Sequence, residues 1–241
     1  MATTFTSKLK NRETLAEGTM GFYFAKPAGF EFKPGQYMDI TLIDPPETDA
    51  EGNIRSFSIA SAPDEDHLLF ATRMRDTAFK RFLRSAPIDT VVKMEGPMGS
   101  FTLHNNASKP AVFLAGGIGI TPFSSILRHA AKAKLPHRLH LFYSNRRPED
   151  AAYMDVLIQL EQQNPNFKFI PSMSEMNKSA QKWNGETGFI NKEMLERHLP
   201  SLQGPIYYIA GPPAMVAAMR QMLAGAGVDE DDIRTEEFAG Y

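Results

Sequence analysis

The sequence predicts two regions of different fold class, an antiparallel β-barrel or sandwich followed by a doubly wound parallel α/β sheet. In residues 1–106, short apolar segments alternate with Pro, Gly and Asp, which is typical of antiparallel strands joined by turns. In residues 107–241, strand-like segments alternate with helical apolar periods, which is typical of a parallel sheet. The segment 105–109 is polar and precedes a proline, so we place the domain boundary between residues 106 and 107.

The first region is expected to contain several short strands and one helix. Its helix is expected over residues 77–85, because Phe79, Phe82 and Leu83 share one face at helical spacing. The strands are expected at residues 21–25, 36–42, 56–60, 68–72 and 90–94.

The second region is expected to alternate strands with helices along its whole length. Strands are expected at residues 111–114, 140–143, 167–170 and 206–209, and helices at residues 122–132, 149–162, 192–197 and 213–224. Thr121 is the expected N-cap of the first of these helices, and Pro122 suits its first position.

Composition excludes several classes of function. The chain has 26 Lys and Arg and 28 Asp and Glu, a net charge of −2, so no strong field would attract nucleic acid or an anionic membrane. There is no cysteine, which excludes disulfides, thiolate zinc sites, iron–sulfur ligation and cysteine nucleophiles within the chain. The histidines show no metal-ligand spacing, so no metal site is expected. Redox chemistry would therefore require an organic cofactor.

No segment of the sequence has the apolar length of a signal peptide core or a membrane span. We therefore expect a cytoplasmic protein without a membrane span. The sequence contains no feature that determines its oligomeric state.

The strongest local motif is the glycine-rich segment 114–122, LAGGIGITP, which follows an expected strand and opens an expected helix. Glycines allow the backbone to approach a pyrophosphate, and the free amides of a helix start attract the anion. Pro122 replaces the third glycine of the general dinucleotide motif, so a tight turn without a ligand is the alternative.

Three further segments combine turn residues with polar or aromatic side chains. In segment 55–61, RSFSIAS, an arginine could grip a phosphate while Phe57 covers a planar ring; an ordinary barrel strand is the alternative. Segment 95–101, EGPMGSF, is rich in turn residues. Segment 208–216, YIAGPPAMV, could line a nucleotide site at the carboxyl edge of the sheet, or be a plain turn.

Together and in this order, these segments resemble the ferredoxin–NADP reductase superfamily of flavoproteins over nearly the whole chain. The family patterns Arg-x-Tyr-Ser, Gly-Pro-x-Gly-x-Phe, Gly-Gly-x-Gly-x-Thr-Pro and Cys-Gly-Pro-Pro correspond to residues 55–58, 96–101, 116–122 and 210–213. The acidic and aromatic tail 236–241, EEFAGY, is also family-like. Phe57 and Ala210 stand where the family has Tyr and Cys.

The resemblance implies that the first region is an FAD-binding β-barrel and the second a nucleotide-binding α/β domain. Phe57, Ser58 and Phe238 would be the catalytic residues. Phe57 would lie against the isoalloxazine and Ser58 would hydrogen-bond near its N5, while Phe238 and Tyr241 are the candidates to cover its other side. Arg55 would bind the flavin pyrophosphate. The further flavin contacts it implies are Ser56, Arg73, Thr77, Lys80 and Tyr241.

Lys80 stands where many relatives have a serine at the start of the barrel helix. It would add charge beside the pyrophosphate, and Thr77 would supply the hydroxyl.

The resemblance also implies a second site for a nicotinamide nucleotide. The residues expected there are Gly116, Gly117, Gly119, Thr121, Pro122, Arg146, Glu175, Gly211 and Pro212. Relatives that prefer NADPH often have Ser-Arg after the third strand, whereas this chain has Ser174 and Glu175. A carboxylate repels a 2′-phosphate, so NADH is favoured over NADPH.

The implied function is a flavin-dependent oxidoreductase. It would take hydride from NAD(P)H onto FAD and pass electrons to a separate acceptor, which could be a ferredoxin, a flavodoxin, an oxygenase component or a small molecule. The alternative is an NAD(P)-responsive sensor or a non-catalytic electron-transfer subunit, which would bind nucleotide without rapid turnover.

Overall fold

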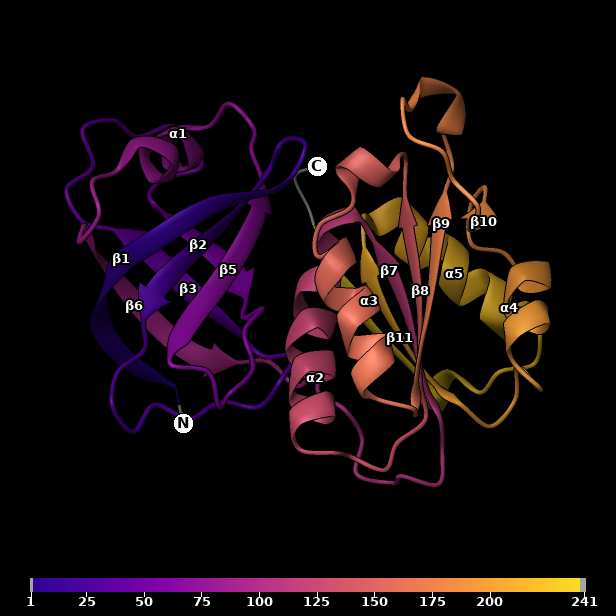
Figure 1. Cartoon of the computed structure of the whole chain (residues 1–241). Coiled ribbons are helices and arrows are strands. Elements are labelled where there is room, and N and C mark those ends of the chain that lie inside the picture. Colours follow the sequence, from indigo (N-terminus) through magenta and orange to yellow (C-terminus); the bar gives the residue numbers. More distant parts are fainter. Residues whose placement is uncertain (1, 239–241) are drawn as a thin grey trace.

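The computed structural model describes residues 2–238 and contains two six-stranded sheets that lie side by side (Figure 1). The first sheet is antiparallel and is formed before residue 99, and the second is parallel and begins at residue 111. The predicted combination of an antiparallel barrel with a doubly wound parallel sheet is therefore confirmed. None of the helices between residues 2 and 238 combines the length and apolar composition needed to cross a bilayer.

The first sheet curls into an open barrel. Its strands run in the order β4-β3-β6-β1-β2-β5. The amide of Ala60 donates to the carbonyl of Leu69 (2.8 Å), so the two edge strands meet just beyond the end of β4. The strands and helix are β1 (Thr3–Ala16), β2 (Thr19–Ala25), β3 (Tyr37–Leu42), β4 (Ile54–Ser58), β5 (His67–Arg73), α1 (Ala78–Ser85) and β6 (Val91–Met98).

Aromatic residues fill the barrel interior. Phe22, Phe24 and Phe70 are fully buried and come from adjacent strands. Helix α1 closes one end of the barrel with Phe79 and Leu83, and the Thr77 hydroxyl accepts from the amide of Lys80 (3.4 Å) as its N-cap. The expected helix at residues 77–85 is thus confirmed, because its apolar face and its cap agree.

The long strand β1 was not expected from the sequence. Within its 14 residues only Ser7 and Leu9 are buried, so the strand shows no regular alternation of apolar side chains. It forms because it pairs with both β2 and β6. Its position is a consequence of backbone pairing across the barrel, which apolar periodicity does not report.

The second sheet has the strand order β10-β9-β8-β7-β11-β12, with α2 and α3 on one face and α4 and α5 on the other (Figure 1). The chain reverses its direction of winding at β7, so the carboxyl ends of β7 and β11 form the switch point. The elements are β7 (Ala111–Gly116), α2 (Ile120–Lys132), β8 (Leu139–Asn145), α3 (Met154–Gln163), β9 (Phe167–Met173), β10 (Glu186–Thr187), α4 (Lys192–His198), β11 (Ile206–Gly211), α5 (Pro213–Gly225) and β12 (Ile233–Glu237).

Two details of this region correct the sequence predictions. The helix expected from residue 149 begins only at Met154, because Pro148–Asp150 is a short 3₁₀ turn and Tyr153 has a left-handed backbone (φ 64°). Thr121 is not the N-cap of α2: Gly119 is, and the Thr121 hydroxyl donates instead to the carbonyl of Ile118 (3.0 Å).

Strand β12 was also not expected. It carries Glu236 and Glu237 and pairs in parallel with β11, so that Ala210 lies opposite Glu236. This pairing brings the end of the described chain back to the switch point between the two sheets.

Candidate active site

A cavity of about 660 Å³ lies on the barrel side of the junction between the sheets. Strand β4, the start of α1 and the end of β12 form its walls, and we call it the barrel-side cavity. Among its lining residues are Tyr37, Arg55, Ser56, Phe57, Ser58, Arg75, Thr77, Lys80, Thr121, Glu236 and Phe238. The structure thus brings together most of the residues that the sequence assigned to flavin binding.

Three cations line one end of this cavity. Arg55 is 16% exposed, and its guanidinium lies 5.3 Å from the ring centre of Phe79. Lys80 donates to the carbonyl of Arg73 (2.8 Å), and burial lowers the pKa of its ammonium group, with Arg75 adding to that effect. Arginine and lysine side chains gathered around a cavity favour a phosphate-bearing ligand.

At this end of the cavity, two carboxylates already contact the donors that could bind a phosphate. Glu51 pairs with Arg55 (2.7 Å), while Asp49 accepts from the amide of Ala78 (2.7 Å) and lies 3.6 Å from Arg55. The amide of Ala78 also holds the pKa of Asp49 below its usual value. A bound phosphate would therefore compete with these two carboxylates for the same donors.

Phe57 and Ser56 point in different directions from β4. Phe57 packs toward the barrel core, with ring centres 5.9 Å from Phe79 and 6.3 Å from Phe70, and one part of it lines the cavity. Ser56 bonds to Asp39 on β3. The residues expected to contact a flavin ring and its chain therefore share one strand, but Ser56 is already partnered.

Glu236 faces Ser58 across the barrel-side cavity. Its Oε1 lies 3.5 Å from the Ser58 hydroxyl, and its Oε2 is buried with no hydrogen-bond partner among residues 2–238. Burial raises the pKa of Glu236 to about 7, against the opposing effect of the Ser58 hydroxyl. A carboxyl group that can hold or release a proton near neutral pH thus stands beside Ser58.

A second cavity, of about 810 Å³, lies at the carboxyl edge of the parallel sheet. We call it the sheet-side cavity. Its lining is largely apolar on the α5 side, with Ala214, Met215 and Met219, and cationic on the other, with Arg73, Arg75 and Arg146. Gly116, Gly117 and Pro212, which the sequence assigned to a nucleotide site, also line this cavity.

The glycines of the turn have different roles. Gly117 has a left-handed backbone (φ 53°) with open space around the position of a Cβ, so it shapes the turn beside the cavity. At Gly119 a Cβ would lie 2.2 Å from the carbonyl oxygen of Ala210, so this glycine lets α2 pack against β11. Gly119 does not line the sheet-side cavity.

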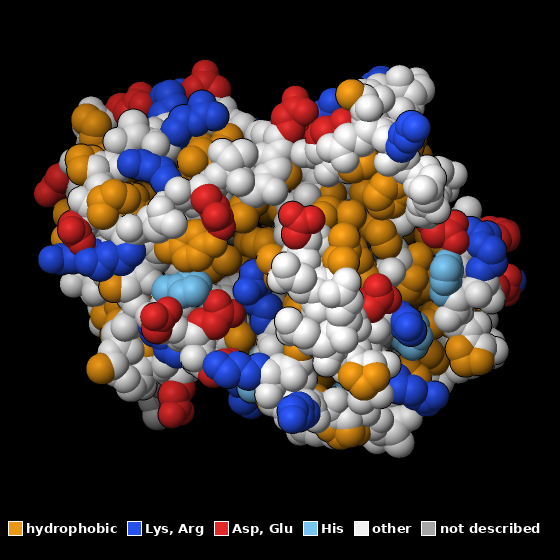
Figure 2. Space-filling view, in the orientation of Figure 1, with side chains coloured by type: hydrophobic (Ala, Val, Ile, Leu, Met, Phe, Trp, Pro, Cys, Tyr) orange, Lys and Arg blue, Asp and Glu red, His pale blue; other side chains and the backbone are white. Residues whose placement is uncertain are grey.

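The two cavities adjoin. Arg75 lines both of them, and the amide of Phe238 donates to the carbonyl of Gly211 (3.0 Å), which places Phe238 at the junction. Figure 2 shows hydrophobic side chains in the depression where the two halves of the molecule meet, with charged side chains around it. A ligand in one cavity can therefore meet a ligand in the other.

Other predicted site residues lie away from where the sequence suggested. Thr121 lines the barrel-side rather than the sheet-side cavity. The Glu175 side chain pairs with Lys178 (2.8 Å) and is absent from the cavity lining, whereas Ser174 and Arg146 line it. Tyr241 lies outside the described residues.

Glu236, Arg75 and Phe189 line the cavities but were not predicted from the sequence to do so. Glu236 was noted only as part of a tail motif, and Arg75 shows no motif at all. Phe189 is 77% exposed and lines the sheet-side cavity, which is unusual for so large an apolar side chain. In the sequence, Phe189 stands only as an aromatic residue directly after Gly188, which does not indicate a cavity.

No three His, Asp or Glu side chains within residues 2–238 are grouped to hold a metal ion. In this fold, an antiparallel barrel with one cavity adjoins a doubly wound parallel sheet with a second cavity.

Comparison with known proteins agrees with this fold. Residues 113–221 match the family model of the oxidoreductase NAD-binding domain. The reductase component of propane 2-monooxygenase from Rhodococcus jostii is 31% identical over 222 residues, which cover 88% of this chain and 57% of that protein. The chain thus spans about three fifths of the length of such curated relatives.

Solved structures share the whole fold. The Amycolatopsis cytochrome P450 reductase GcoB matches with a TM-score of 0.83 and 24% identity, over 98% of this chain and 70% of that one. A ferredoxin NADP+ reductase from Neisseria gonorrhoeae, with bound FAD and NADP, matches with a TM-score of 0.80 and 21% identity, over 97% and 98%. The shared fold and the matched family model agree with the resemblance to the ferredoxin–NADP reductase superfamily that the motifs indicated.

Proposed function

We propose that this chain is an FAD-dependent NAD(P)H oxidoreductase that passes electrons to a separate acceptor. The observation that carries this proposal is the adjoining pair of cavities, which share Arg75 and are lined by the two sets of family motifs. The names of the relatives support it, because the Rhodococcus protein is a reductase component and the Acinetobacter baylyi one an electron transfer component. Residues 1–106 would form the FAD-binding domain and residues 107–241 the NAD(P)-binding domain.

The barrel-side cavity fits FAD. Arg55, Lys80 and Arg75 would bind the pyrophosphate, with the amides at the start of α1 and the Thr77 hydroxyl nearby. The buried, unpartnered Oε2 of Glu236 marks a polar position that the ring system of a flavin can satisfy. When bound, FAD would accept a hydride from the nicotinamide and release its electrons to the acceptor.

The side chains around the flavin position would orient it and control protons. Phe57 would hold one face of the ring and Phe238 the other, so Phe238 would have to move before a nicotinamide could stack. Ser58 would hydrogen-bond near the reacting nitrogen, and Glu236 would set the direction of that hydroxyl proton. Ser56 would contribute through its bond to Asp39, which keeps β4 in register.

The sheet-side cavity fits a dinucleotide, because Gly116, Gly117 and Pro212 line it together with the cations Arg73 and Arg146. We propose NADH as the preferred donor because the Glu175 carboxylate, although outside the cavity lining, directly follows Ser174, which lines it, and would repel a 2′-phosphate. Lys178 and Arg146 both lower the pKa of Glu175, so they offset part of its repulsion. The preference for NADH should therefore be modest.

The acceptor would be a separate protein or a small molecule, since this chain has no cysteine to hold an iron–sulfur cluster. Oxygenase components are one candidate class, because several relatives are named as reductases of monooxygenases and dioxygenases. Ferredoxins, flavodoxins and free small molecules are the others.

Anaerobic stopped-flow spectroscopy of the FAD-reconstituted protein tests the proposal. NADH is expected to bleach the oxidised flavin band within the mixing experiment, and NADPH to do so more slowly. A flavin-bound protein that neither nucleotide reduces would contradict the enzyme and favour an NAD(P)-responsive sensor. A protein that binds no flavin would remove the basis of both.

A further inference from the structure

Helix α2 connects the two cavities through its first two turns. It begins at Ile120, directly after the glycine turn beside the sheet-side cavity, and Thr121 in its first turn lines the barrel-side cavity. One turn later it presents two serines, Ser124 and Ser125, toward the barrel. Both are buried, with exposures of 1% and 0%.

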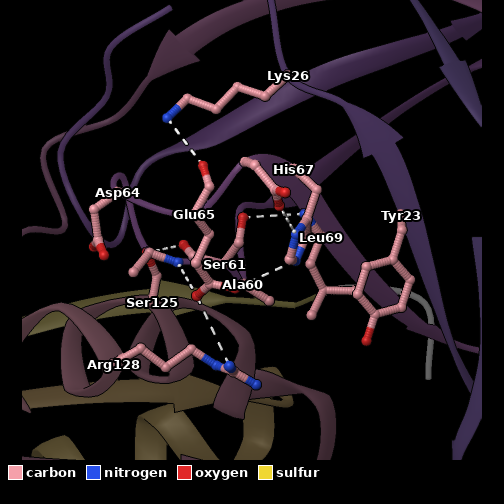
Figure 3. A network of polar contacts seen from close by, with 12 residues as sticks. Tyr23, Lys26, Ala60, Ser61, Asp64, Glu65, His67, Leu69, Ser125 and Arg128 are labelled. Carbon is pink, nitrogen blue, oxygen red and sulfur yellow. Dashed lines mark hydrogen bonds and ion pairs between the residues drawn. The ribbon is translucent and has the colours of Figure 1, made fainter. Parts of the chain in front are cut away.

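Both serine hydroxyls donate to the backbone of the barrel. Ser124 Oγ lies 3.0 Å from the carbonyl oxygen of Ala60, and Ser125 Oγ lies 2.7 Å from that of Ser61. Figure 3 shows Ser125 on its helix facing this segment. Ala60 and Ser61 follow Ser58 by two and three residues, so these bonds hold the end of the strand that lines the barrel-side cavity.

The segment that the serines hold is itself rigid. The amide of Ala60 donates to Leu69, and the amide of Leu69 donates to the Ser61 hydroxyl (3.1 Å). Arg128, one turn further along α2, donates to Ser124 Oγ (3.1 Å) and lies 3.8 Å from Glu65 (Figure 3). Helix α2 is thus joined by two buried hydrogen bonds to the segment that directly follows Ser58.

Two buried hydroxyls of this kind are not required for packing alone, because alanine would fill most of the same space. The hydrogen bonds of these hydroxyls are directional, so each one fixes the position of one backbone carbonyl after β4 relative to the second turn of α2. The geometry points to a fixed separation between the glycine turn and Ser58.

We propose that Ser124 and Ser125 are positioning residues that set the distance between a nicotinamide in the sheet-side cavity and a flavin in the barrel-side cavity. This inference rests on the proposed function. The reaction would transfer one hydride, which consists of two electrons and one proton, from a nicotinamide to a flavin held in these cavities. Its rate depends steeply on that separation, because a misplacement of about 1 Å can cost about a hundredfold.

The test is the double variant Ser124→Ala/Ser125→Ala, reconstituted with FAD and mixed anaerobically with NADH. The rate constant of flavin reduction at saturating NADH is expected to fall about 10- to 100-fold. Flavin content and the Kd for NADH are expected to change less than about twofold, because neither serine lines the sheet-side cavity and the anion-binding groups are untouched.

Ser7→Ala is the matched control. The Ser7 hydroxyl is also buried and also donates to a carbonyl, that of Ala25 (2.6 Å), but both residues lie within the barrel. A loss of stability alone would affect this control and the double variant alike. Only the positioning role predicts that flavin reduction at saturating NADH is slower in the double variant and unchanged in Ser7→Ala.

If the double variant does not fold, Ser125→Ala alone keeps the bonds of Ser124 and Arg128, and a smaller loss of rate in the same direction is expected. Reduction of a folded variant at the unaltered rate would overturn the positioning role while leaving the proposed function in place. Failure of the unaltered, FAD-loaded protein to be reduced by either nucleotide would overturn both.

Discussion

Arg55 shows how one side chain can depend on its neighbours for its role. Its guanidinium carries the charge that the proposed pyrophosphate site needs, but Glu51 and Asp49 already contact it. Binding of FAD would replace these carboxylates by phosphate oxygens. Flavin affinity therefore reflects a balance between the cation and its two competitors.

Arg55→Ala is expected to weaken FAD binding about 10- to 100-fold, because charge-assisted hydrogen bonds to the pyrophosphate are lost. Titration of the flavin-free protein with FAD, followed by fluorescence quenching, measures the change. Arg81→Ala is the control, since Arg81 pairs with Glu47 and Asp76 and does not line the cavity. Glu51→Gln should change affinity in the opposite direction, and weaker binding in that variant would contradict the competition.

Glu236 is the residue with the clearest pH dependence. Its folded pKa of about 7 lies above the ordinary value of 4.5, so the folded state binds the proton more tightly than the unfolded state. Its contribution to stability is therefore fully present below pH 4.5 and is lost as the pH rises through 7.

Glu236→Gln should remove this dependence. We expect the flavin-free variant to have a flatter profile of Tm between pH 5 and pH 8, and a higher Tm than the unaltered protein at pH 8. Glu237→Gln is the control, because that side chain is exposed on the same strand. Parallel profiles for the unaltered protein and Glu236→Gln would show that the carboxyl does not titrate in this range.

At the scale of elements, the glycine turn and α2 form one packed unit with β11. The sequence motif suggested that all the glycines line a nucleotide, but Gly119 is there because α2 passes within contact distance of Ala210. A motif identifies the residues and the turn, whereas only the packing shows which glycine faces the ligand and which faces the neighbouring strand.

Gly119→Val is therefore expected to lower the stability of the fold by about 1–3 kcal/mol through overpacking against the Ala210 carbonyl. Urea unfolding of the flavin-free protein measures it. Gly225→Ala is the matched control: a Cβ there meets nothing within 4 Å, and a change of no more than about 0.5 kcal/mol is expected. Equal stability of Gly119→Val and the unaltered protein would contradict the packing role.

At the scale of the whole molecule, a second polar cluster fastens the link between the sheets. The Tyr208 hydroxyl on β11 accepts from the amide of His104 (2.8 Å) and from Arg234 (3.2 Å), and lies 3.0 Å from His104 Nδ1. Arg234 also donates to the carbonyl of Thr102 (2.9 Å). Burial lowers the pKa of His104, so the ring is neutral at neutral pH and Nδ1 can accept the Tyr208 proton.

Tyr208→Phe is expected to lower stability by about 1–3 kcal/mol, since it leaves the buried amide and Nδ1 of His104 without this hydroxyl. Denaturant unfolding measures the loss. Tyr207→Phe provides the comparison, because its buried hydroxyl makes one bond, to the carbonyl of Leu202 (2.8 Å), within the parallel-sheet region. A larger loss of stability for Tyr207→Phe than for Tyr208→Phe would contradict the role of Tyr208 in holding the segment between the sheets.

Local chemistry in the sequence was enough for the fold class, for most strands and helices, and for some of the residues that line the two cavities. Apolar period, turn residues and helix caps act over a few neighbouring residues, so segments such as α1 and β7 could be predicted from their own composition. The ordered motifs then led to Arg55, Phe57, Ser58 and the glycine turn, all of which lie at or beside the cavities.

Only the tertiary structure decided what depends on contacts between distant segments. Strands β1 and β12 are held by pairing and show little apolar alternation of their own. The raised pKa of Glu236, the packing of Gly119 on Ala210 and the bonds of Ser124 and Ser125 to the barrel all join residues far apart in the chain. Burial and close approach are properties of the assembled fold, and for this reason the local sequence around each residue could not report them.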